Sequence, residues 1–227
     1  MVAPPPPAPQ PAPPPPPPAK SSDPKPVEVL REAFDELNSE RWREVEVAGH
    51  AEFSVVELDG ERVLRASSRD TGSILLTALR FNPDDYEWIS WRWRVDTFAD
   101  GEDLATKRGS DAAARVYVYF DTPGLPWQRR NIDYVWSDTL PVGTILPSAF
   151  SKASMIIVAE SGRAHQGRWR HVVRDLEKDY KACFGEDPPA ALAVGLMTDS
   201  DNTNSASLAY FDDLVISRRR PDASPGY

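Results

Sequence analysis

Within the expected strand 86–96, residues 89–96 alternate strictly between large apolar and polar side chains, and this pattern constrains the fold more than any other in the chain. The apolar positions are Ile89, Trp91, Trp93 and Val95, and the alternate positions are Ser90, Arg92 and Arg94. Successive side chains of a β-strand point to opposite faces of the sheet. The segment therefore predicts a strand whose tryptophans pack in a core and whose arginines lie on the other face.

The segment 113–121 repeats this pattern. Its predicted core positions are Val116, Val118 and Phe120, and its opposite face carries Arg115, Tyr117, Tyr119 and Asp121. Aromatic rings and guanidinium groups on one sheet face are typical of a ligand site, because rings stack and arginines give directional hydrogen bonds. The alternative is a solvated face on which arginine stems cover the tyrosine rings. We expect Arg92 and Arg94 to extend this surface, with Trp127 and Trp136 adding stacking.

Further strands follow from alternation and turn residues. A hairpin is predicted at 52–68 around Asp59-Gly60, with Leu58 opposite Glu61 and Val55 opposite Leu64. The other expected strands are 72–80, 132–138, 153–160, 168–174, 190–198 and 207–217. A short helix or strand is expected at 26–37. About ten strands with one or two short helices predict an all-β antiparallel sandwich of the jelly-roll type.

One later helix has clear boundaries. Leu176, Tyr180, Cys183 and Phe184 share a helical face, and Asp175 can cap the start. Gly185, followed by two prolines, is expected to end the helix. The single cysteine excludes an intrachain disulfide, and its place on the apolar face predicts a buried, unreactive thiol.

The start of the chain differs in composition from the rest. Proline occupies 14 of the first 26 positions, which favours an extended polyproline segment. We expect a disordered tether at 1–26, one domain at 27–217 and a flexible tail at 218–227. The first residues resemble no signal peptide, and no apolar run is long enough to span a membrane. A proline-rich stalk on an acidic domain favours the periplasm or cell envelope.

The net charge is -9, from 35 acidic and 26 basic residues. Duplex nucleic acid requires a cationic surface, so this balance argues against such a partner. Arginines beside tryptophans keep single-stranded nucleic acid as a minor alternative. The histidines His50, His165 and His171 lack metal-ligand spacing, and we find no common hydrolase, phosphate-loop or dinucleotide motif.

Acidic clusters offer two further kinds of site. Asp199 and Asp201 alternate as in a calcium loop, but the positions that need glycine and glutamate in an EF-hand are Asn204 and Tyr210. Another calcium site could be completed by Asp212 or Asp213, and a self-bonded polar turn is the alternative. One member of the Asp212 and Asp213 pair should face an apolar layer and need an arginine or metal partner.

Carboxylates could also provide an acid and base for glycan hydrolysis. The candidates are Asp111, Asp175, Asp179 and Asp199. A helix cap is the alternative role for Asp175. The segments 97–112 and 122–131 are polar loops of the kind that form lids or binding loops, and the second contains Trp127.

Several motifs together resemble one bacterial family. They are Trp91-Arg92-Trp93-Arg94, the segment 111–121, Arg174-Asp175-Leu176, Asp179-Tyr180, Phe184-Gly185 and 198–203. The family is catalogued as domain of unknown function 3047, and the resemblance extends from about Trp42 to Ile216. It implies no established activity. Where that family has an acidic pair before the arginine strand, this chain has Ser110-Asp111.

The closing segment 210–216 resembles the last strand of galactose-binding-like jelly rolls, a group that includes carbohydrate-binding modules and a complex I assembly factor family. That resemblance implies a sandwich in which structural calcium is common. Our leading hypothesis is a non-catalytic envelope domain that recognises a saccharide or other polar ligand. The alternatives are a glycan-active enzyme and a scaffold that binds a protein partner.

Overall fold

The computed structural model describes residues 25–125 and 128–222. Most of the predicted tether, the end of the predicted tail and Trp127 therefore lie outside the described residues. Within these ranges the chain forms thirteen strands and one α-helix. No helix in the described part of the chain is long and apolar enough to cross a membrane.

The strands form two sheets. Sheet A has the order β11-β6-β13-β4-β3, and β1 also pairs with β13. Its strands are β1 (Glu28–Glu32), β3 (Glu52–Leu58), β4 (Glu61–Arg69), β6 (Trp88–Thr97), β11 (Arg170–Asp175) and β13 (Ala206–Ser217). Sheet B has the order β2-β5-β12-β7-β8-β10-β9. Its strands are β2 (Trp42–Ala48), β5 (Gly72–Phe81), β7 (Arg115–Phe120), β8 (Asn131–Ser137), β9 (Ile145–Pro147), β10 (Ser154–Ser161) and β12 (Ala191–Asp199).

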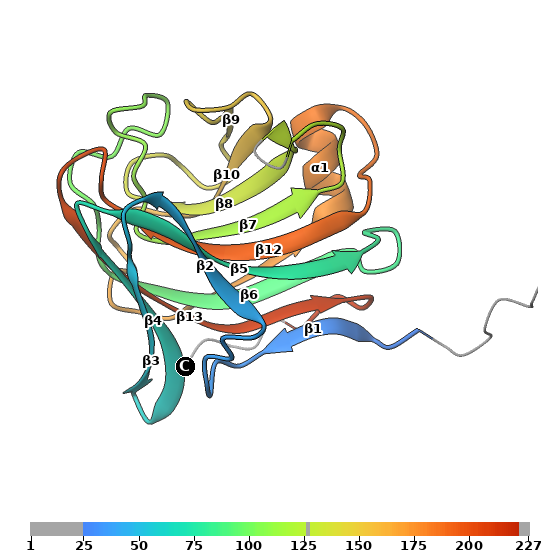
Figure 1. The fold of residues 1–227 in the computed structure, drawn as a ribbon, viewed down its shortest axis with the longest axis horizontal. Coiled ribbons are helices and arrows are strands. Elements are labelled where there is room, and N and C mark those ends of the chain that lie inside the picture. Colours follow the sequence, from blue (N-terminus) through green and yellow to red (C-terminus); the bar gives the residue numbers. More distant parts are fainter. Residues whose placement is uncertain (1–24, 126–127, 223–227) are drawn as a thin grey trace, which may run out of the picture.

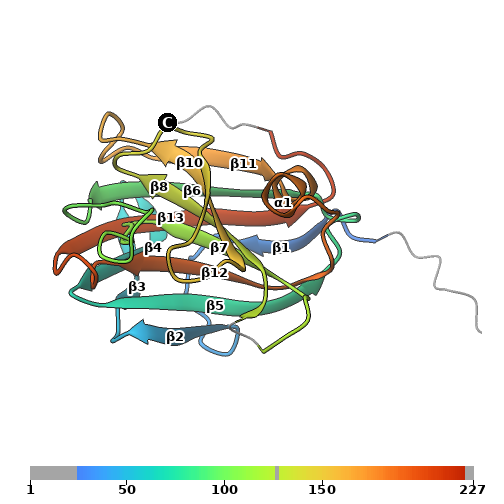
Figure 2. The same cartoon turned by 90° about the horizontal axis from the view of Figure 1, so that it is seen from above.

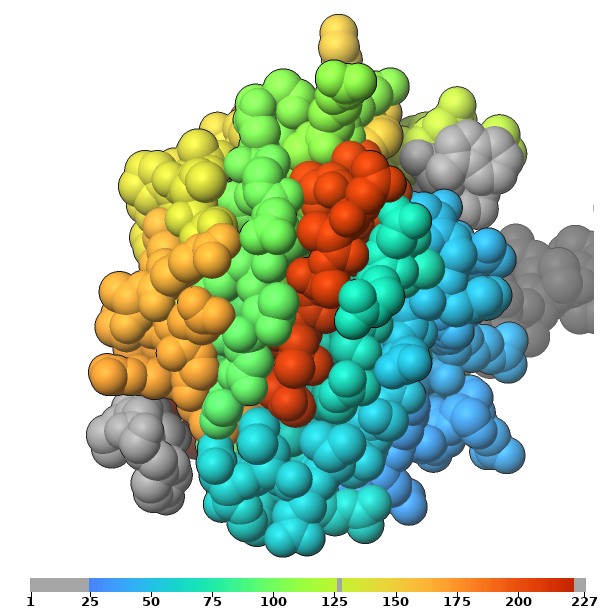
Figure 3. All heavy atoms as spheres, turned by 90° about the vertical axis from the view of Figure 1, so that its left-hand side faces the viewer, coloured from blue at the N-terminus to red at the C-terminus, as the bar shows by residue number. Residues whose placement is uncertain are grey.

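The two sheets stack face to face, and the helix α1 (Leu176–Phe184) lies at one end of the sandwich (Figures 1 and 2). In Figure 3 the red segment lies between a green and a teal segment, as the neighbouring strands β6, β13 and β4 require. The predicted β-sandwich of jelly-roll type is confirmed. One detail of the prediction is wrong, because β8 and β10 pair in parallel while the other strand pairs are antiparallel.

The predicted hairpin is confirmed residue by residue. Leu58 pairs with Glu61 and Val55 with Leu64. Asp59 and Gly60 have φ values of 56° and 86°, the left-handed conformation that a type I′ turn requires. The two-residue turn fixes the register, and the register places the apolar side of the hairpin toward the core.

The core lies between the sheets and contains the residues that alternation assigned to it. Trp91 and Trp93 are fully buried, and their rings meet edge to face with centroids 5.2 Å apart. Tyr134 and Trp136 of β8 pack against them from the opposite sheet. Buried aromatic contacts of this kind add to the stabilisation from apolar burial, and they hold the middle of the two sheets together.

Helix α1 begins and ends where its capping residues predict. The Asp175 carboxylate accepts a hydrogen bond of 3.0 Å from the Lys178 backbone N–H. Gly185 ends the helix with φ 75°, a conformation that glycine adopts without steric penalty. Burial raises the pKa of the Cys183 thiol to about 12, consistent with the predicted unreactive cysteine.

Two strands, β2 and β9, were not predicted, and both lie at edges of sheet B. At 26–37, where a short helix or a strand is expected, the structure has the strand β1. Val45 and Val47 of β2 are 43% and 57% exposed, so this strand has little buried face to mark it in the sequence. Edge strands need only one partner, and their side chains follow alternation less strictly than those of central strands.

The loop 97–112 packs against the body of the domain instead of forming an open lid. Phe98 and Leu104 are buried. The buried Glu102 carboxylate accepts hydrogen bonds from the Ser137 hydroxyl and from the Asp138 backbone N–H. These contacts fix the loop and place its last residues beside β7 and β12.

Candidate functional site

The arginine faces of β6 and β7 lie on opposite sides of the molecule. β6 belongs to sheet A and β7 to sheet B, and both strands turn their apolar residues inward. The prediction that Arg92, Arg94, Arg115, Tyr117 and Tyr119 share one surface is therefore wrong. Alternation identifies an outer face but does not identify the sheet to which it belongs.

On sheet A, acidic residues already pair with both arginines. Arg92 binds Glu61 at 2.8 Å and also pairs with Asp212. Arg94 binds Asp96 at 2.6 Å and Asp59 at 3.0 Å. Few donors of these guanidinium groups remain available to a ligand, and Arg94 lies over the Tyr210 ring, so this outer face matches the alternative of a solvated face on which arginines cover tyrosine rings.

Asp212 and Asp213 both reach Arg92 because β13 bulges at this point. Asp213 has φ 47°, and the register with β6 shifts between Asp212 and Val215. The shift keeps both carboxylates out of the core, and the Arg92 to Asp213 distance is 2.9 Å. An arginine is thus the partner that the sequence required. Burial raises the pKa of Asp212 to about 6.

The outer face of sheet B is hollowed along β7. Tyr117 and Tyr119 lie on the same side of this strand, half-buried, with ring centroids 5.6 Å apart and ring planes 19° from parallel. One hollow of about 530 Å³ contains both rings, and an adjoining hollow of about 540 Å³ shares Ile74, Tyr119 and Arg129 with it. We call the two hollows together the tyrosine groove.

The two ends of the tyrosine groove differ in character. The first hollow has polar groups around the rings, including Ser110, Arg115, Arg129, Asn131, Asp199 and Asn202. The second is mainly apolar and is lined by Val45, Ile74, Leu76, Tyr119, Arg129, Leu192 and Ala193. Gly195 pairs with Tyr117 across the strands, and a Cβ at this glycine would lie 2.7 Å from Ile74 Cγ2. The glycine therefore lets Ile74 lie over β12 between the two ends.

Arg115 lies buried beneath the polar end of the tyrosine groove. It is 3% exposed and pairs with Asp133 and, at 3.1 Å, with Asp199. Its third nitrogen donates to the Ser110 carbonyl oxygen. Burial alone would lower the pKa of Arg115, but the two carboxylates raise it well above its usual value. Arg115 therefore orients neighbouring groups, and most of its donors do not face the groove.

Both carboxylates of this buried cluster are electrostatically perturbed. Burial raises the pKa of Asp199 to about 7 and also raises that of Asp133, although Arg115 opposes both shifts. The uncharged forms of these groups are thus favoured more than in water. Perturbed titratable groups beside a hollow are common at functional sites, and buried ion pairs also produce them.

The predicted calcium ligands separate into two places. Asp199 and Asp201 lie together with Asp111, and their carboxylate oxygens are within 4.8 Å of one another. Asp212 and Asp213 instead bind Arg92 on sheet A, so the prediction that one of them completes a calcium site with Asp199 and Asp201 is wrong. Asp111 also accepts a 2.8 Å hydrogen bond from the Thr203 backbone N–H. Asp111, which the sequence analysis did not include in this cluster, is far from the other two aspartates in sequence and is brought to them by the packed 97–112 loop.

The predicted acid and base residues also separate. Asp111 and Asp199 are neighbours in this cluster, whereas Asp175 caps α1. Asp179 accepts hydrogen bonds from Arg174 and from the Tyr134 hydroxyl, both at 2.8 Å. In the structure Asp175 therefore stabilises the start of α1, and Asp179 stabilises the packing of α1 against β8.

Trp136 cannot stack on a surface ligand in this structure. Its side chain is fully buried against Trp93, and its Nε1 donates to the Gly162 carbonyl oxygen at 3.1 Å. The prediction failed because the side chain of Trp136 is on the face of β8 that points toward the core. Asn131, on the outward parity of the same strand, reaches the groove instead, and alternation could have found it.

Comparison with family models gives a single decisive result. The model described as "Protein of unknown function (DUF3047)" matches residues 40–215, which is most of the chain. The chain belongs to the DUF3047 family. The match includes all of the residues that line the tyrosine groove and every strand except β1 and the last residues of β13. No curated protein matches this DUF3047 chain.

Solved structures similar to the DUF3047 domain include three carbohydrate-binding modules. A family 11 module of a Clostridium thermocellum cellulosomal cellulase has 9% identity and a TM-score of 0.44, with 86% of this chain and 99% of that chain covered. A family 30 module of another cellulase of that organism has 13% identity and a TM-score of 0.46, with 84% and 96% covered. A xylan-binding family 22 module of Paenibacillus barcinonensis has 11% identity and a TM-score of 0.40, with 84% and 93% covered.

Proposed function

We propose that the DUF3047 domain is a non-catalytic binding domain of the bacterial cell envelope that holds a saccharide in the tyrosine groove. The observation that carries this proposal is the stacked pair of half-buried rings, Tyr117 and Tyr119, inside a hollow with polar borders. Ligand sites typically have volumes of about 300 to 1,000 Å³ and a few converging polar groups. The volume of about 530 Å³ falls in this range.

The chemistry of the groove suits a sugar chain. A sugar ring has an apolar C–H face, which packs on an aromatic ring, and a rim of hydroxyl groups, which need hydrogen-bond partners. Tyr117 and Tyr119 provide the rings, while Arg129 and Asn131 provide donors and acceptors at the border. The adjoining apolar hollow extends toward β5 and β2, so further sugar units could continue across the sheet.

The carboxylates near the groove favour binding over hydrolysis. Glycosidases place two carboxyl groups on either side of the bond that is cleaved. Asp199 accepts hydrogen bonds from Arg115 and from the Ala112 backbone N–H at 2.9 Å. Asp111 binds the 202–203 turn. Both groups are thus occupied in holding loops together, which supports a non-catalytic domain.

The test is binding of the purified domain to a panel of plant and bacterial polysaccharides, by affinity electrophoresis and calorimetry. Tyr117→Ala and Tyr119→Ala should each weaken binding about tenfold or more. Stacking of a nucleobase on an aromatic ring contributes about 1 to 3 kcal/mol, and we expect packing of a sugar face on a tyrosine ring to contribute a similar amount. Trp169→Ala is the matched control, because this half-buried ring packs over Arg92 on the opposite sheet. It should leave the affinity unchanged.

Two results would count against the saccharide proposal. The first is that no polysaccharide binds the wild-type domain. The second is that binding survives in the Tyr117→Ala, Tyr119→Ala double variant. Capture of a protein through the exposed side chains Val45, Val47 and Phe150 at the groove border, with no saccharide bound, would favour the alternative of a scaffold.

We also propose that Asp111, Asp199 and Asp201 hold a calcium ion. Carboxylate oxygens lie about 2.3 to 2.6 Å from bound calcium, so two ligands on one ion are at most about 5 Å apart. The spread of 4.8 Å among these oxygens is compatible with that limit. Because Arg115 already neutralises Asp199, we expect weak binding, with a Kd of about 10⁻⁴ to 10⁻³ M. Calcium should raise the Tm of the wild-type domain but not of Asp201→Asn, and an equal Tm in calcium and in chelator would refute the site.

A further inference from the structure

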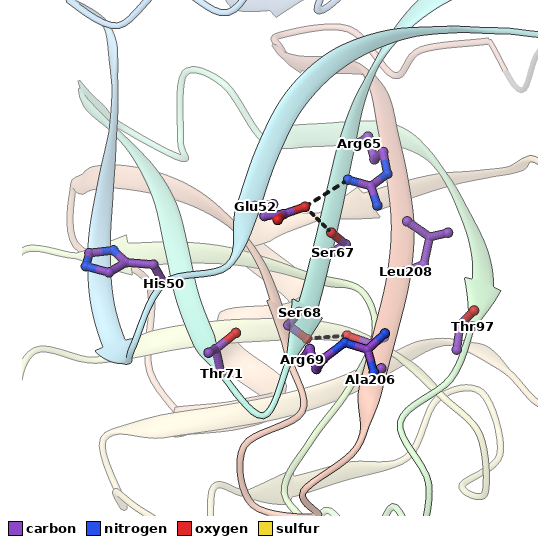
Figure 4. A pocket seen from close by; sticks show the side chains of 11 residues that line it. His50, Glu52, Arg65, Ser67, Ser68, Arg69, Thr71, Thr97, Ala206 and Leu208 are labelled. Carbon is purple, nitrogen blue, oxygen red and sulfur yellow. Dashed lines mark hydrogen bonds and ion pairs between the residues drawn. The ribbon is translucent and has the colours of Figure 1, made fainter.

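Another hollow opens on sheet A, on the other side of the sandwich from the two hollows of the tyrosine groove. Its volume is about 560 Å³. Its lining comes from the turn after β2, the turn between β4 and β5, and the strands β3, β4, β6 and β13. It includes His50, Glu52, Arg65, Ser67, Arg69 and Thr97 (Figure 4). None of its lining residues lines the tyrosine groove. The hollow is therefore a separate candidate site, which the predicted arginine and tyrosine surface did not include.

Two arginines flank this hollow along one strand. Arg65, Ser67 and Arg69 have the same parity in β4 and so share its outer face. Figure 4 shows Arg65 and Arg69 at different ends of the strand segment that crosses the hollow, with Ser67 between them. Four residues of an extended strand span about 13 Å. The two guanidinium groups can therefore engage two separate groups of an elongated ligand.

Neither arginine is strongly held by the protein. Arg65 meets Glu52 at 3.4 Å, and the Glu52 side chain is 80% exposed. Such exposed pairs contribute little stability and are easily exchanged. Arg69 is exposed and makes no ion pair with the residues that the structure describes. This differs from Arg92 and Arg94 on the same sheet, each of which pairs with two or more carboxylates.

The floor beside these arginines is rigid. The buried Ser68 hydroxyl bonds with Ser207 at 2.7 Å and with Ser200 at 2.9 Å. Ser207 also bonds with Thr198 at 2.7 Å. This chain of hydroxyl groups joins β4, β13 and β12, so it links the two sheets below the hollow. A fixed floor holds β4 in place and lowers the entropy lost when a ligand binds.

We propose that this hollow binds an acidic oligosaccharide, or another elongated ligand with two oxyanion groups, which Arg65 and Arg69 engage at separate points. Carboxylate, sulfate and phosphate groups share the chemistry that an arginine fork recognises through paired charge-assisted hydrogen bonds. An incoming oxyanion replaces Glu52 on Arg65 and supplies Arg69 with its first acidic partner. The chain as a whole is strongly acidic, so selection of an anion here depends on these two local cations.

Calorimetry on the full chain at low salt tests the proposal. The ligands are a short oligogalacturonate, its neutral methyl ester, monomeric galacturonate and inorganic sulfate. We expect the oligogalacturonate to bind most tightly, and added NaCl to weaken its binding. Arg65→Ala and Arg69→Ala should each reduce its affinity about tenfold, as loss of a charge-assisted hydrogen-bond pair implies. Arg62→Ala is the matched control, since Arg62 is an exposed arginine of β4 outside the hollow.

Several outcomes would overturn the proposal. These are absence of oligogalacturonate binding to the wild-type chain, unchanged affinity in the Arg65→Ala, Arg69→Ala double variant, or an equal loss in Arg62→Ala. Equal affinity for inorganic sulfate and the oligosaccharide would overturn the two-point arrangement. The Tyr117→Ala, Tyr119→Ala variant should bind oligogalacturonate at this hollow as the wild type does. The result is thus separable from the test of the tyrosine groove.

Discussion

Replacing Arg115 with methionine should destabilise the domain more than any single surface change. Arg115, Asp133 and Asp199 are 3%, 1% and 4% exposed, so the substitution leaves two carboxylates buried without their cation. Removing one partner from a buried ion pair usually destabilises a protein by about 3 to 5 kcal/mol. For a domain of this length the corresponding decrease in Tm is roughly 6 to 20 °C. That loss is a large fraction of a typical total stability of about 5 to 15 kcal/mol.

The destabilisation should depend on pH in a defined direction. Burial already raises the pKa of Asp199 to about 7 and raises that of Asp133. Without Arg115 both carboxyl groups take up protons more readily, and protonation removes the unpaired charge. The loss of stability in Arg115→Met should therefore be smaller at pH 5 than at pH 8.

Urea denaturation followed by tryptophan fluorescence measures this effect, because Trp91 and Trp93 lie in the core between the sheets. Arg94→Met is the control, since this arginine pairs with acids at the surface of sheet A and its loss should matter by at most about 1 kcal/mol. Equal stability losses in the two variants, or a loss in Arg115→Met that does not change with pH, would refute the reasoning.

Three further outcomes are expected. The pKa of Asp199 in the folded state, about 7, is above its ordinary value of 3.8. Between these pH values the folded state binds more protons than the unfolded state, so the free energy of unfolding decreases as pH rises from about 4 to 7. Asp199→Asn should flatten this part of a Tm-versus-pH profile. Asp175→Ala should reduce the unfolding free energy by about 1 kcal/mol through loss of the α1 cap, measured by urea denaturation. Gly195→Ala should destabilise the domain by about 1 to 3 kcal/mol, because the added methyl group displaces Ile74, and it should also weaken saccharide binding in calorimetry.

Local patterns predicted the elements whose signals are complete within a few residues. The hairpin at Asp59-Gly60 has both its turn and its alternation in one segment, and its register was predicted correctly. Helix α1 likewise carries its own caps. By contrast, β2 pairs only with β5 and exposes its valines. The sequence around it therefore lacks the alternation of buried apolar and exposed polar residues that marks a strand. Prediction from one sequence therefore succeeds where the information is local, even for the edge strand β3, and fails for a strand such as β2 that has neither a local turn nor a buried face.

The candidate site shows the same limit in a different form. Arg92 and Arg115 occupy equivalent outward positions in similar alternating strands, yet their environments differ because of partners that are distant in sequence. A bulge in β13 brings Asp212 and Asp213 to Arg92, whereas β8 and β12 bring Asp133 and Asp199 to Arg115.

Most N–H donors of both arginines therefore bind groups of the protein itself, and few remain to bind a ligand. Among the described residues that line hollows, Tyr117 and Tyr119 on sheet B and Arg65 and Arg69 on sheet A are more available to a ligand. Charge and aromatic content in a sequence thus indicate which faces are polar, but recognition depends on the side chains that the fold leaves without a partner. For this domain, that criterion narrows the expected surface of β6 and β7 to the tyrosines of β7, and it adds the arginines of β4.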